Sequence, residues 1–244
     1  MARVAVVHNT LDFQGGADIV CLTVCAALQE GHDVTLYTLS ETDPRVLAER
    51  FDIDLDAEAL TVRMPTGAVT AARGLSSVAP VLGPQLPLRS VLVHRIFERD
   101  ADAFDLAVST ANEFSFSIPS VQYVHYPQFH TGRLANGSSG PLNRLWSRLG
   151  GPKRAALRSD RVTVLANSAW TAGVVGEIYG VTPAVLHPPV DPIDGGKRWD
   201  ERENGIVVVG RIASDKRTLD AIRVADGVRE RGHDVHLHVV GAAP

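Results

Sequence analysis

Two basic residues flank a predicted strand-to-helix loop in the C-terminal part of the sequence. Arg211 directly follows the apolar run from Ile206 to Val209, and Lys216 lies at the start of the next helical pattern. Two cations beside a helix N-terminus can hold a diphosphate from both sides, because the partial positive charge of the helix adds to theirs. The alternative is that both are ordinary exposed basic side chains, and their spacing favours neither interpretation.

A glycine pair, Gly15 and Gly16, follows the apolar run from Val4 to Val7 and precedes a helical pattern. Without side chains in the way, backbone N–H groups here can approach an anion at the start of the helix. A tight turn that requires glycine is an equally good interpretation. The GxGxxG fingerprint follows neither of the two strands that open a predicted domain, which argues against an NAD or FAD enzyme, and no cofactor is predicted.

His125 lies in the segment VQYVHYP, at the end of a predicted strand over residues 121–125. A single histidine among aromatic residues is most often a packed side chain. Ligands of doubly wound sheets, however, bind at the carboxyl ends of the strands. Because of this position, we select His125 as the candidate catalytic residue.

These residues need a parallel sheet to hold them, and the sequence predicts one. The motif GHDV occurs twice, at residues 31–34 and 232–235, each time after a strand, a loop and a helical pattern. In each copy the glycine is expected to close the helix at positive φ, so that both copies are turns of βαβ units. Two such units predict an α/β protein with two doubly wound domains in tandem.

Further buried strands are expected at residues 34–37, 106–109 and 162–166, with Ser168 as the N-cap of the next helix and Gly180 at its end. A charged tract rich in proline and glycine then marks a domain boundary. The predicted division is a Rossmann-like N-terminal domain at residues 1–188, a linker at 189–204 and an incomplete second Rossmann-like domain at 205–244.

Composition limits the function. Of the 244 residues, 45% are hydrophobic, which is typical of a globular protein with a full core. A formal net charge of −4 argues against nucleic acid as the main partner. The N-terminus enters a strand without a signal-peptide pattern, so a cytoplasmic location is expected. Cys21 and Cys25, one helical turn apart, are expected to be buried thiols rather than a metal or redox pair.

Five motifs, taken together and in order, carry a family resemblance. GGAD, VHYP, NSAWT, HPPVD and VVVGRIASDK resemble the retaining GT-B glycosyltransferases of family four. The series VQYVHYP, NSAWT and HPPVD is most similar to the branch that includes the dolichol-linked α-1,2-mannosyltransferase of N-glycan assembly. The resemblance covers nearly the whole chain. It implies two Rossmann-like domains facing a cleft, and transfer of a hexose such as mannose, with retention, from a nucleotide-sugar donor to a glycan or lipid-linked acceptor.

The resemblance also assigns roles by position. Arg211 and Lys216 would hold the donor diphosphate and stabilise it as the leaving group, and the glycine pair, chiefly Gly16, would lie by the donor phosphate. His125 would lie by the transferred sugar. Retaining transfer in this fold is usually attributed to front-face attack, with the leaving phosphate accepting the acceptor proton. Neither a carboxylate pair nor an essential metal is therefore implied, and no metal site is predicted.

The end of the sequence departs from the family pattern. The chain stops one βαβ unit into the second domain, before the paired-glutamate motif that holds the donor ribose and sugar. A catalytically inactive remnant, or one piece of a split glycosyltransferase, is therefore the alternative function. The acidic segment FDIDLD at residues 51–56 mimics the metal motif of the other glycosyltransferase fold. It follows no predicted phosphate-facing strand, so we interpret it as a solvated turn.

A basic amphipathic segment lies between residues 133 and 161, where the positive charges exceed the negative ones by six. Leu142, Leu145, Trp146 and Leu149 are interleaved at helical spacing, which is the pattern of a helix that lies on an anionic lipid surface. The alternative is a surface helix whose apolar side packs on the core. The lipid-linked acceptor implied by the resemblance favours peripheral contact with the inner membrane face.

Overall fold

The computed structural model describes residues 1–64, 67, 70, 73–74, 77, 85–111, 113–133, 141–190, 195–210, 212 and 216–241. The chain divides into two compact units, Met1–Pro189 and Val190–Pro244. Arg211, one of the two predicted diphosphate ligands, lies outside the described residues.

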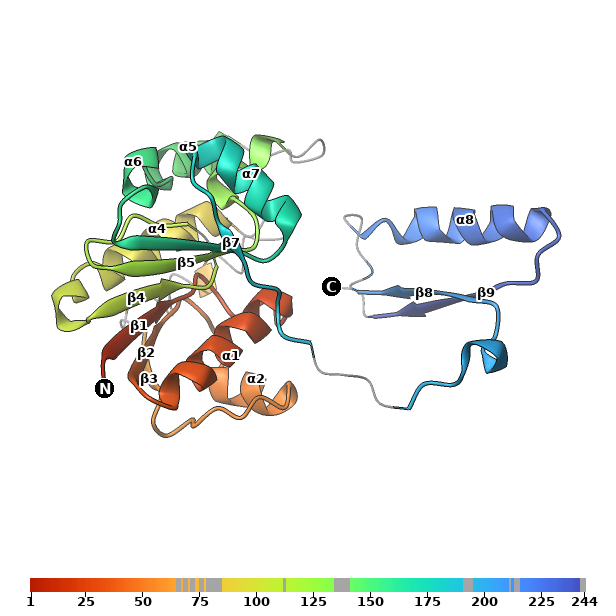
Figure 1. Ribbon diagram of the computed structural model, residues 1–244, viewed down its shortest axis with the longest axis horizontal. Helices are drawn as coiled ribbons and strands as arrows, with labels where there is room; N and C mark the ends of the chain where they lie inside the picture. Colours follow the sequence, from red (N-terminus) through yellow and green to blue (C-terminus); the bar gives the residue numbers. More distant parts are fainter. Residues whose placement is uncertain are drawn as a thin grey trace. The chain divides into compact units, whose positions relative to one another are not determined.

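The first unit is built on a seven-stranded parallel sheet in the order β3-β2-β1-β4-β5-β6-β7 (Figure 1). The strands are β1 Arg3–Val7, β2 Asp33–Tyr37, β3 Thr61–Arg63, β4 Leu106–Ser109, β5 Ser120–Val124, β6 Val162–Ala166 and β7 Ala184–Val185. The strand order reverses between β1 and β4, and doubly wound sheets bind ligands at such a reversal. The prediction of an α/β fold with a parallel sheet is confirmed.

Helices occupy the crossovers between the strands. They are α1 Gly16–Gln29, α2 Pro44–Arg50, α4 Leu86–Phe97, α5 Pro141–Gly150, α6 Arg154–Leu157 and α7 Ala169–Tyr179, with the 3-10 helices η1 Ala101–Ala103 and η2 Gln128–Arg133. The predicted caps of α7 are confirmed: the Ser168 side chain accepts a hydrogen bond from the Thr171 N–H, and Gly180 closes the helix at φ 68°. Gly180 is suited to this position because glycine adopts positive φ without steric cost.

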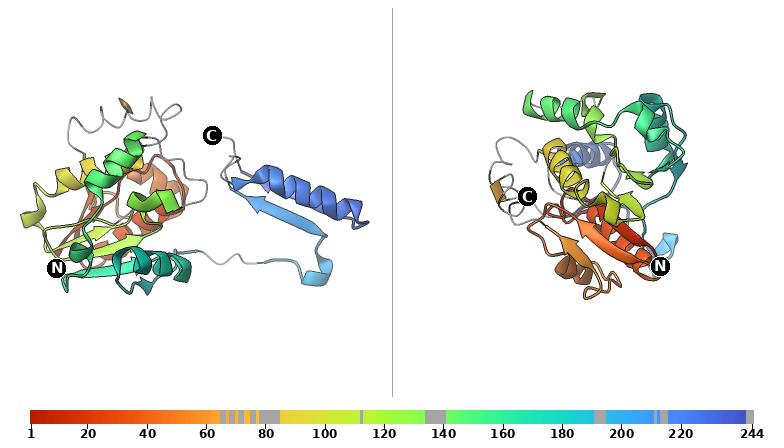
Figure 2. Two further views of the ribbon diagram at one scale, coloured as in Figure 1. Left: turned by 90° about the horizontal axis from the view of Figure 1, so that it is seen from above. Right: turned by 90° about the vertical axis from the view of Figure 1, so that its left-hand side faces the viewer.

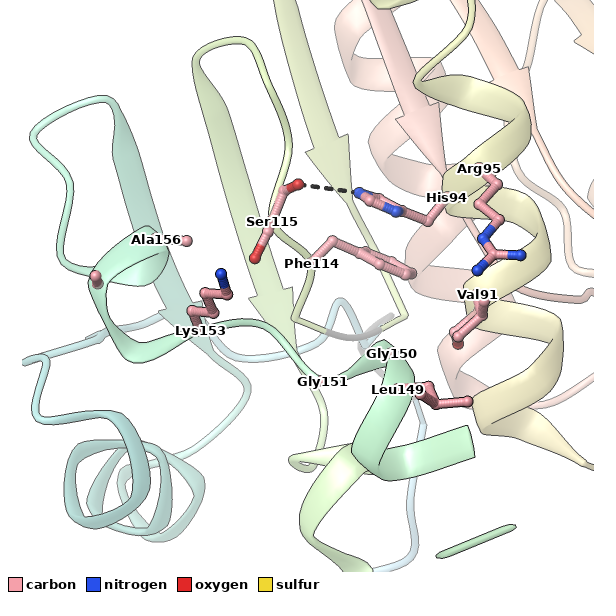
Figure 3. Close-up of a pocket in the computed structure, with 12 residues that line it drawn as sticks. Val91, His94, Arg95, Phe114, Ser115, Leu149, Gly150, Gly151, Lys153 and Ala156 are labelled. Carbon is pink, nitrogen blue, oxygen red and sulfur yellow. Dashed lines mark hydrogen bonds between the residues drawn. The ribbon is translucent and has the colours of Figure 1, made fainter. Parts of the chain in front are cut away.

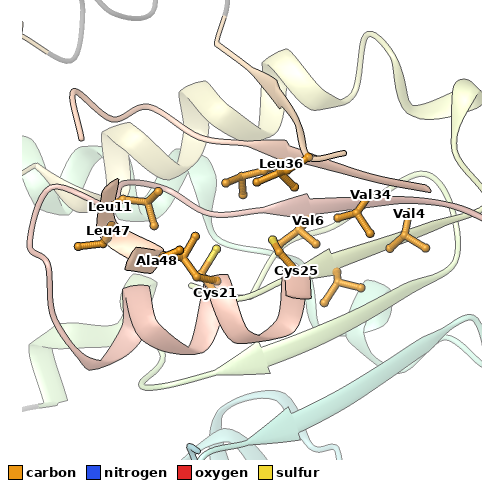
Figure 4. Close-up of a cluster of buried hydrophobic side chains, with 12 residues drawn as sticks. Val4, Val6, Leu11, Cys21, Cys25, Val34, Leu36, Leu47 and Ala48 are labelled. Atoms are coloured by element: carbon orange, nitrogen blue, oxygen red, sulfur yellow. The ribbon is translucent and has the colours of Figure 1, made fainter. Parts of the chain in front are cut away.

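The alternation of side chains along β1 creates two cores. Val4 and Val6 pack with the buried side chains of α1 and α2, whereas Ala5 and Val7 pack with those of α4. Figure 4 shows the first of these clusters, in which both cysteines of α1 lie against the sheet. Cys21 and Cys25 are free, and both are buried as predicted.

The two copies of GHDV form different turns. Gly232 adopts φ +84°, as predicted for a helix-closing glycine. At the first copy the prediction is wrong, because α1 ends on Glu30 in the right-handed region and Gly31 has no positive φ. There the Gly31 and His32 N–H groups both donate to the Leu28 carbonyl, and β2 begins at the next residue. The turn between α1 and β2 is therefore tighter than predicted, because its conformation follows from the position of β2 in the sheet and not from the local sequence.

In the acidic segment at residues 51–56 the three aspartates are exposed, as predicted, whereas Phe51, Ile53 and Leu55 pack against the first core. Asp52 adopts φ 54°, and the Asp56 carboxylate accepts hydrogen bonds from the N–H groups of Glu58 and Ala59. The carboxylate of Asp56 therefore caps a local turn. Among the described residues, no group of three or more histidine, cysteine, aspartate or glutamate side chains could hold a metal ion.

The second unit contains one βαβ element. Strand β8, Gly205–Val209, and strand β9, His236–Val240, pair in parallel, and α8, Thr218–Glu230, connects them (Figure 2). A 3-10 helix, η3 Trp199–Glu201, precedes β8. Apolar side chains of both strands and of the helix are exposed: Val207, Val209, Val239 and Val240 on the sheet and Leu219, Ile222 and Val224 on α8.

The core around α1 should dominate the stability of the first unit. Leu22→Ala removes a fully buried side chain, and we expect the free energy of unfolding to fall by about 2–5 kcal/mol. Val46→Ala on α2 is the matched control, because this side chain is 62% exposed and should change stability by less than about 0.5 kcal/mol. Urea unfolding followed by tryptophan fluorescence measures both, and equal losses would contradict the assigned core.

Candidate functional site

Polar side chains gather beyond the carboxyl ends of the central strands, and most of them are buried. Members of this set include His8, Asn9, Thr10, Asp18, Thr38, Ser40, Arg89, Ser90, Thr110, Glu113 and Gln128. A buried polar group is costly unless it is hydrogen-bonded, so each of these side chains needs a partner in the protein. Their hydrogen bonds show which segments are held together at the carboxyl edge of the sheet.

His8 directly follows β1 and is 1% exposed. Its Nε2 donates to Asp18 Oδ1 at 3.0 Å, and its Nδ1 lies 3.0 Å from Thr110 Oγ1. Burial alone would lower the pKa of His8, but the negative charge of the Cys21 thiolate and the Asp18 carboxylate outweigh it and raise this pKa to about 10. Burial opposes ionisation of Cys21, but a hydrogen bond from Cys25 and the charge of His8 lower the pKa of Cys21 to about 5. His8 therefore carries a positive charge near neutral pH, and both of its ring nitrogens donate.

His125 lies just beyond β5, and its protonation state is set by the same network. Its Nε2 lies 3.0 Å from the Thr110 backbone oxygen, and a carbonyl can only accept, so Nε2 carries the proton. Burial, together with the positive charge of His8, lowers the pKa of His125 to about 4. The ring is therefore neutral, and Nδ1 is an acceptor with no partner among the described residues.

The glycine loop is tied to this network through Asp18. The Gly15 N–H donates to Asp18 Oδ2 at 3.0 Å, so it is already engaged. Gln14, and neither glycine, adopts the left-handed φ of 48° in this loop. A Cβ on Gly16 would meet no atom within 4 Å. The fold therefore does not require glycine at this position, and the open space beside Gly16 lies at the N-terminus of α1.

A second buried cluster centres on Glu113, which follows β4. The Tyr179 hydroxyl donates to Glu113 Oε1 at 2.6 Å and lies 3.2 Å from His130 Nδ1. Burial raises the pKa of Glu113 to about 7, although the Tyr179 hydrogen bond opposes this shift. Glu113 thus changes charge near neutral pH while joined to both α7 and η2.

Hydrogen bonds from α4 hold the loops at this edge. Ser90 Oγ donates to Gln128 Oε1 at 3.1 Å, and Asn9 Nδ2 donates to the same oxygen at 3.4 Å. The Arg89 guanidinium donates to the Leu39 carbonyl at 3.0 Å and lies 3.4 Å from Asp12 Oδ2. One helix therefore fixes the segments that follow β1, β2 and β5.

An aromatic pair lies next to His125 on the exposed surface. Trp170, in the first turn of α7, is 62% exposed and stacks on Tyr126 with ring centroids 5.8 Å apart and planes 20° apart. The neighbouring Thr171 hydroxyl donates to the His125 carbonyl at 3.3 Å, which joins α7 to the end of β5. The edge therefore presents a flat apolar face beside a neutral hydrogen-bond acceptor.

Lys216 belongs to the second unit and lies at the carboxyl end of β8. A Cβ on Gly210 would lie 3.9 Å from Lys216 Cδ, so the lysine stem covers this glycine. The helix α8 begins at Thr218, two residues beyond the predicted start. Arg217 pairs with Asp220 at 2.7 Å, whereas Lys216 has no carboxylate partner among the described residues.

Within the described part of the basic amphipathic segment, α5 contains the four apolar residues of the predicted helix and ends at Gly150, and the short helix α6 begins at Arg154. On α5 the apolar side chains of Leu145 and Leu149 are exposed, as are the basic side chains of Arg144 and Arg148. The side chains of Arg133 and Leu142, also part of the predicted pattern, lie outside the described ones.

Comparison with known proteins identifies no family for this chain. No protein-family model matches it, and no curated protein matches it. Within the described residues, no helix is both long enough and apolar enough to cross a membrane.

Sequence reasoning selected His125 and the glycine pair but missed the side chains that connect them. His8 and Thr110 belong to no motif, and their only signal was their position just after β1 and just after β4. Asp18 is the last residue of the GGAD motif, but no role was predicted for it. Glu113 was missed for a different reason. Its burial and its contact with Tyr179, 66 residues away, arise only in the folded chain.

Glu113 should make stability depend on pH. Its pKa in the folded state, about 7, lies above its ordinary value of 4.5, so the folded state favours the protonated form. The stabilisation from Glu113 is therefore complete below pH 4.5 and is lost as the pH rises to 7. Relative to Glu113→Gln, which stays neutral, the wild type should lose at most about 3 kcal/mol over this interval. Urea unfolding of both proteins at pH 4.5 and 8 tests this, and an unchanged difference would refute it.

Proposed function

We propose that this chain takes part in glycosyl transfer: a hexose, mannose by resemblance, passes from a nucleotide-sugar donor to a glycan or lipid-linked acceptor with retention. The proposal places the chain with the GT-B glycosyltransferases of family four. The observation that carries it is the neutral His125 at the carboxyl edge of the sheet, next to an exposed aromatic face. This combination matches the chemistry of a sugar, which has hydroxyl groups around its rim and apolar C–H faces.

His125 would accept a hydrogen bond from a hydroxyl of the transferred sugar. Its Nε2 proton is held by the Thr110 carbonyl, so Nδ1 is available to accept and the ring keeps one orientation. The depressed pKa matters here, because a protonated ring would offer donors at both nitrogens. His125 would thus position the sugar, and no proton transfer by His125 is required.

The donor phosphates would be bound by groups that supply positive potential. Gly16 would bring its backbone close to a phosphate oxygen at the start of α1, where the helix dipole favours an anion. Lys216, together with Arg211, would bind the diphosphate and stabilise the charge that develops as it leaves. Lys216 is available for this role because no described carboxylate neutralises it.

Nucleotide-sugar binding provides the first test. GDP-mannose and UDP-glucose at millimolar concentration are added to the chain, and the melting temperature is measured. We expect at least one to stabilise the protein, and Gly16→Ala to abolish the effect, because the new methyl group occupies the space meant for the phosphate. Gly31→Ala is the matched control, since its Cβ would also meet no atom within 4 Å and it lies at the opposite end of α1.

Both glycine variants should melt within about 2 °C of the wild type without ligand, since neither substitution creates a clash or strain. Failure of every nucleotide sugar to stabilise the wild type would refute the proposed donor class. Equal stabilisation of the wild type and both variants would refute the role of Gly16 while leaving the donor class standing.

The proposal includes peripheral membrane contact through α5. Each basic residue near an anionic surface contributes on the order of 1 kcal/mol, and Leu145 and Leu149 supply exposed apolar area. We expect flotation with anionic vesicles, weaker binding at high salt, and loss of binding for Arg144→Gln with Arg148→Gln. Replacing Arg229 and Arg231 on the second unit is the charge-matched control. Equal recovery with neutral and anionic vesicles would exclude this contact.

A further inference from the structure

A cavity of about 420 Å³ lies between α4, the segment after β4, and α5 with α6 (Figure 3). It is separate from the aromatic pair and from Gly16, neither of which lines it. Its lining combines apolar and cationic groups, and none of the described residues that line it is acidic. The inference drawn from it does not depend on the proposed glycosyl transfer.

One side of the cavity is apolar and well fixed. Val91 from α4 and Leu149 from α5 lie on this side, with Phe114 behind them (Figure 3). The two helices pack closely at Gly150, where a Cβ would lie only 2.2 Å from a Val91 methyl carbon. Glycine is required here by this close approach, which holds the end of α5 against α4. The apolar wall is therefore part of the packed structure.

The opposite side is polar and carries unneutralised charge. Lys153 and Ser115 lie together there, whereas Arg95, the second cation of the lining, lies on α4 beside Val91 and away from Lys153 (Figure 3). Neither cation has a carboxylate partner among the described residues. The Ser115 hydroxyl is buried and makes no hydrogen bond to any described group. An anion beside Lys153 and Ser115 would satisfy both of these groups at once.

Glu98, the acidic residue that pairs with the lining residue His94, is already engaged. Glu98 Oε1 lies 3.6 Å from His94 Nε2 and accepts a hydrogen bond from the Ser117 N–H at 3.2 Å. His94 in turn is held by the Ser115 carbonyl at 3.0 Å and by stacking on Phe114. The polar groups of His94 and Glu98 are therefore already paired with protein groups. The net charge that faces a ligand comes from Arg95 and Lys153.

The apolar wall continues out of the cavity along α5. Leu149 lines the cavity and is 65% exposed, and Leu145, one helical turn earlier, is also exposed. Residues four apart lie on the same face of a helix, so the two leucines form a short apolar path leading from the cavity. A ligand with a charged end and an apolar chain can use both parts.

We propose that this cavity binds an anionic amphiphile, with its phosphate at Lys153 and the Ser115 hydroxyl and its apolar chain against Val91 and Leu149. The phosphate could belong to a lipid headgroup or to a soluble phosphate ester, and both present the same chemistry. The Lys153 ammonium and the Ser115 hydroxyl bind the charge, Arg95 adds positive potential to the lining, and the apolar wall provides affinity that inorganic phosphate cannot use.

Hexyl phosphate is the probe, and isothermal titration calorimetry is the measurement. We expect hexyl phosphate to bind at least tenfold more tightly than either inorganic phosphate or hexanol. Arg95→Gln with Lys153→Gln should weaken this binding at least tenfold, and both residues are exposed, so the fold should be unaffected. The matched control is Arg229→Gln with Arg231→Gln, which removes the same charge from the second unit, outside the cavity lining.

Leu149→Ser tests the apolar wall separately, because this substitution should weaken the binding of hexyl phosphate but not the binding of inorganic phosphate. Dihexanoyl phosphatidic acid below its micelle concentration identifies the source: tighter binding than hexyl phosphate supports a lipid, and equal binding supports a soluble ester. Equal affinities for hexyl phosphate and inorganic phosphate, equal losses in the two double variants, or no binding of hexyl phosphate at millimolar concentration would each overturn the proposal.

Discussion

The buried pair of His8 and Asp18 is the interaction on which the functional edge depends. It joins the end of β1 to the first turn of α1, and through Thr110 it reaches the end of β4. Two charges in a dry interior are costly to bury, and they persist only when each is fully hydrogen-bonded. Here Asp18 is satisfied by His8 and the Gly15 N–H, and His8 is satisfied by Asp18 and Thr110. Removing one partner from such a pair costs about 3–5 kcal/mol because the other charge is left alone.

The pair also determines the chemistry of the neighbouring histidine. The positive charge of His8 opposes a second positive charge nearby, and the Thr110 carbonyl fixes the proton of His125 on Nε2. This edge of the sheet therefore holds one charged histidine directly after β1 and one neutral histidine directly after β5, with β4 between the two strands. The charged one is buried and structural, whereas the neutral one is partly exposed and can accept a hydrogen bond from a ligand.

Helix α4 has a comparable role on the other face of the sheet. Its first turns fix the loops after β1, β2 and β5 through Arg89 and Ser90, and its later turns form a wall of the cavity beside α5. The proposed sugar site and the proposed amphiphile site therefore share one rigid support. They differ in charge: the His125 region offers a neutral acceptor and aromatic rings, and the cavity offers two cations.

The sequence by itself determined the strands, the parallel sheet and the position of His125. Short β-branched runs separated by helical patterns have few alternatives, and parallel sheets place the residues after each strand at one edge. It failed where a result depends on contacts between distant residues. The same four letters, GHDV, give a left-handed glycine at Gly232 but not at Gly31, because β2 must begin at once beside β1. The short strand β3 gave no signal of its own, since three residues form a strand only when β2 is there to pair with them.

In the candidate functional site, too, some features could be predicted from the sequence and others only from the tertiary structure. Spacing could select Gly16 and His125 as residues that follow strands, but it could not show that His8, Asp18 and Thr110 connect them. Nor could it show that Glu113 meets Tyr179 or that Ser115 and Lys153 face one cavity. Hydrogen bonds and desolvation act over a few ångströms in space, whereas the sequence records only separation along the chain. Only the tertiary structure decides which charges are buried together, and therefore which of these groups are charged and which are neutral.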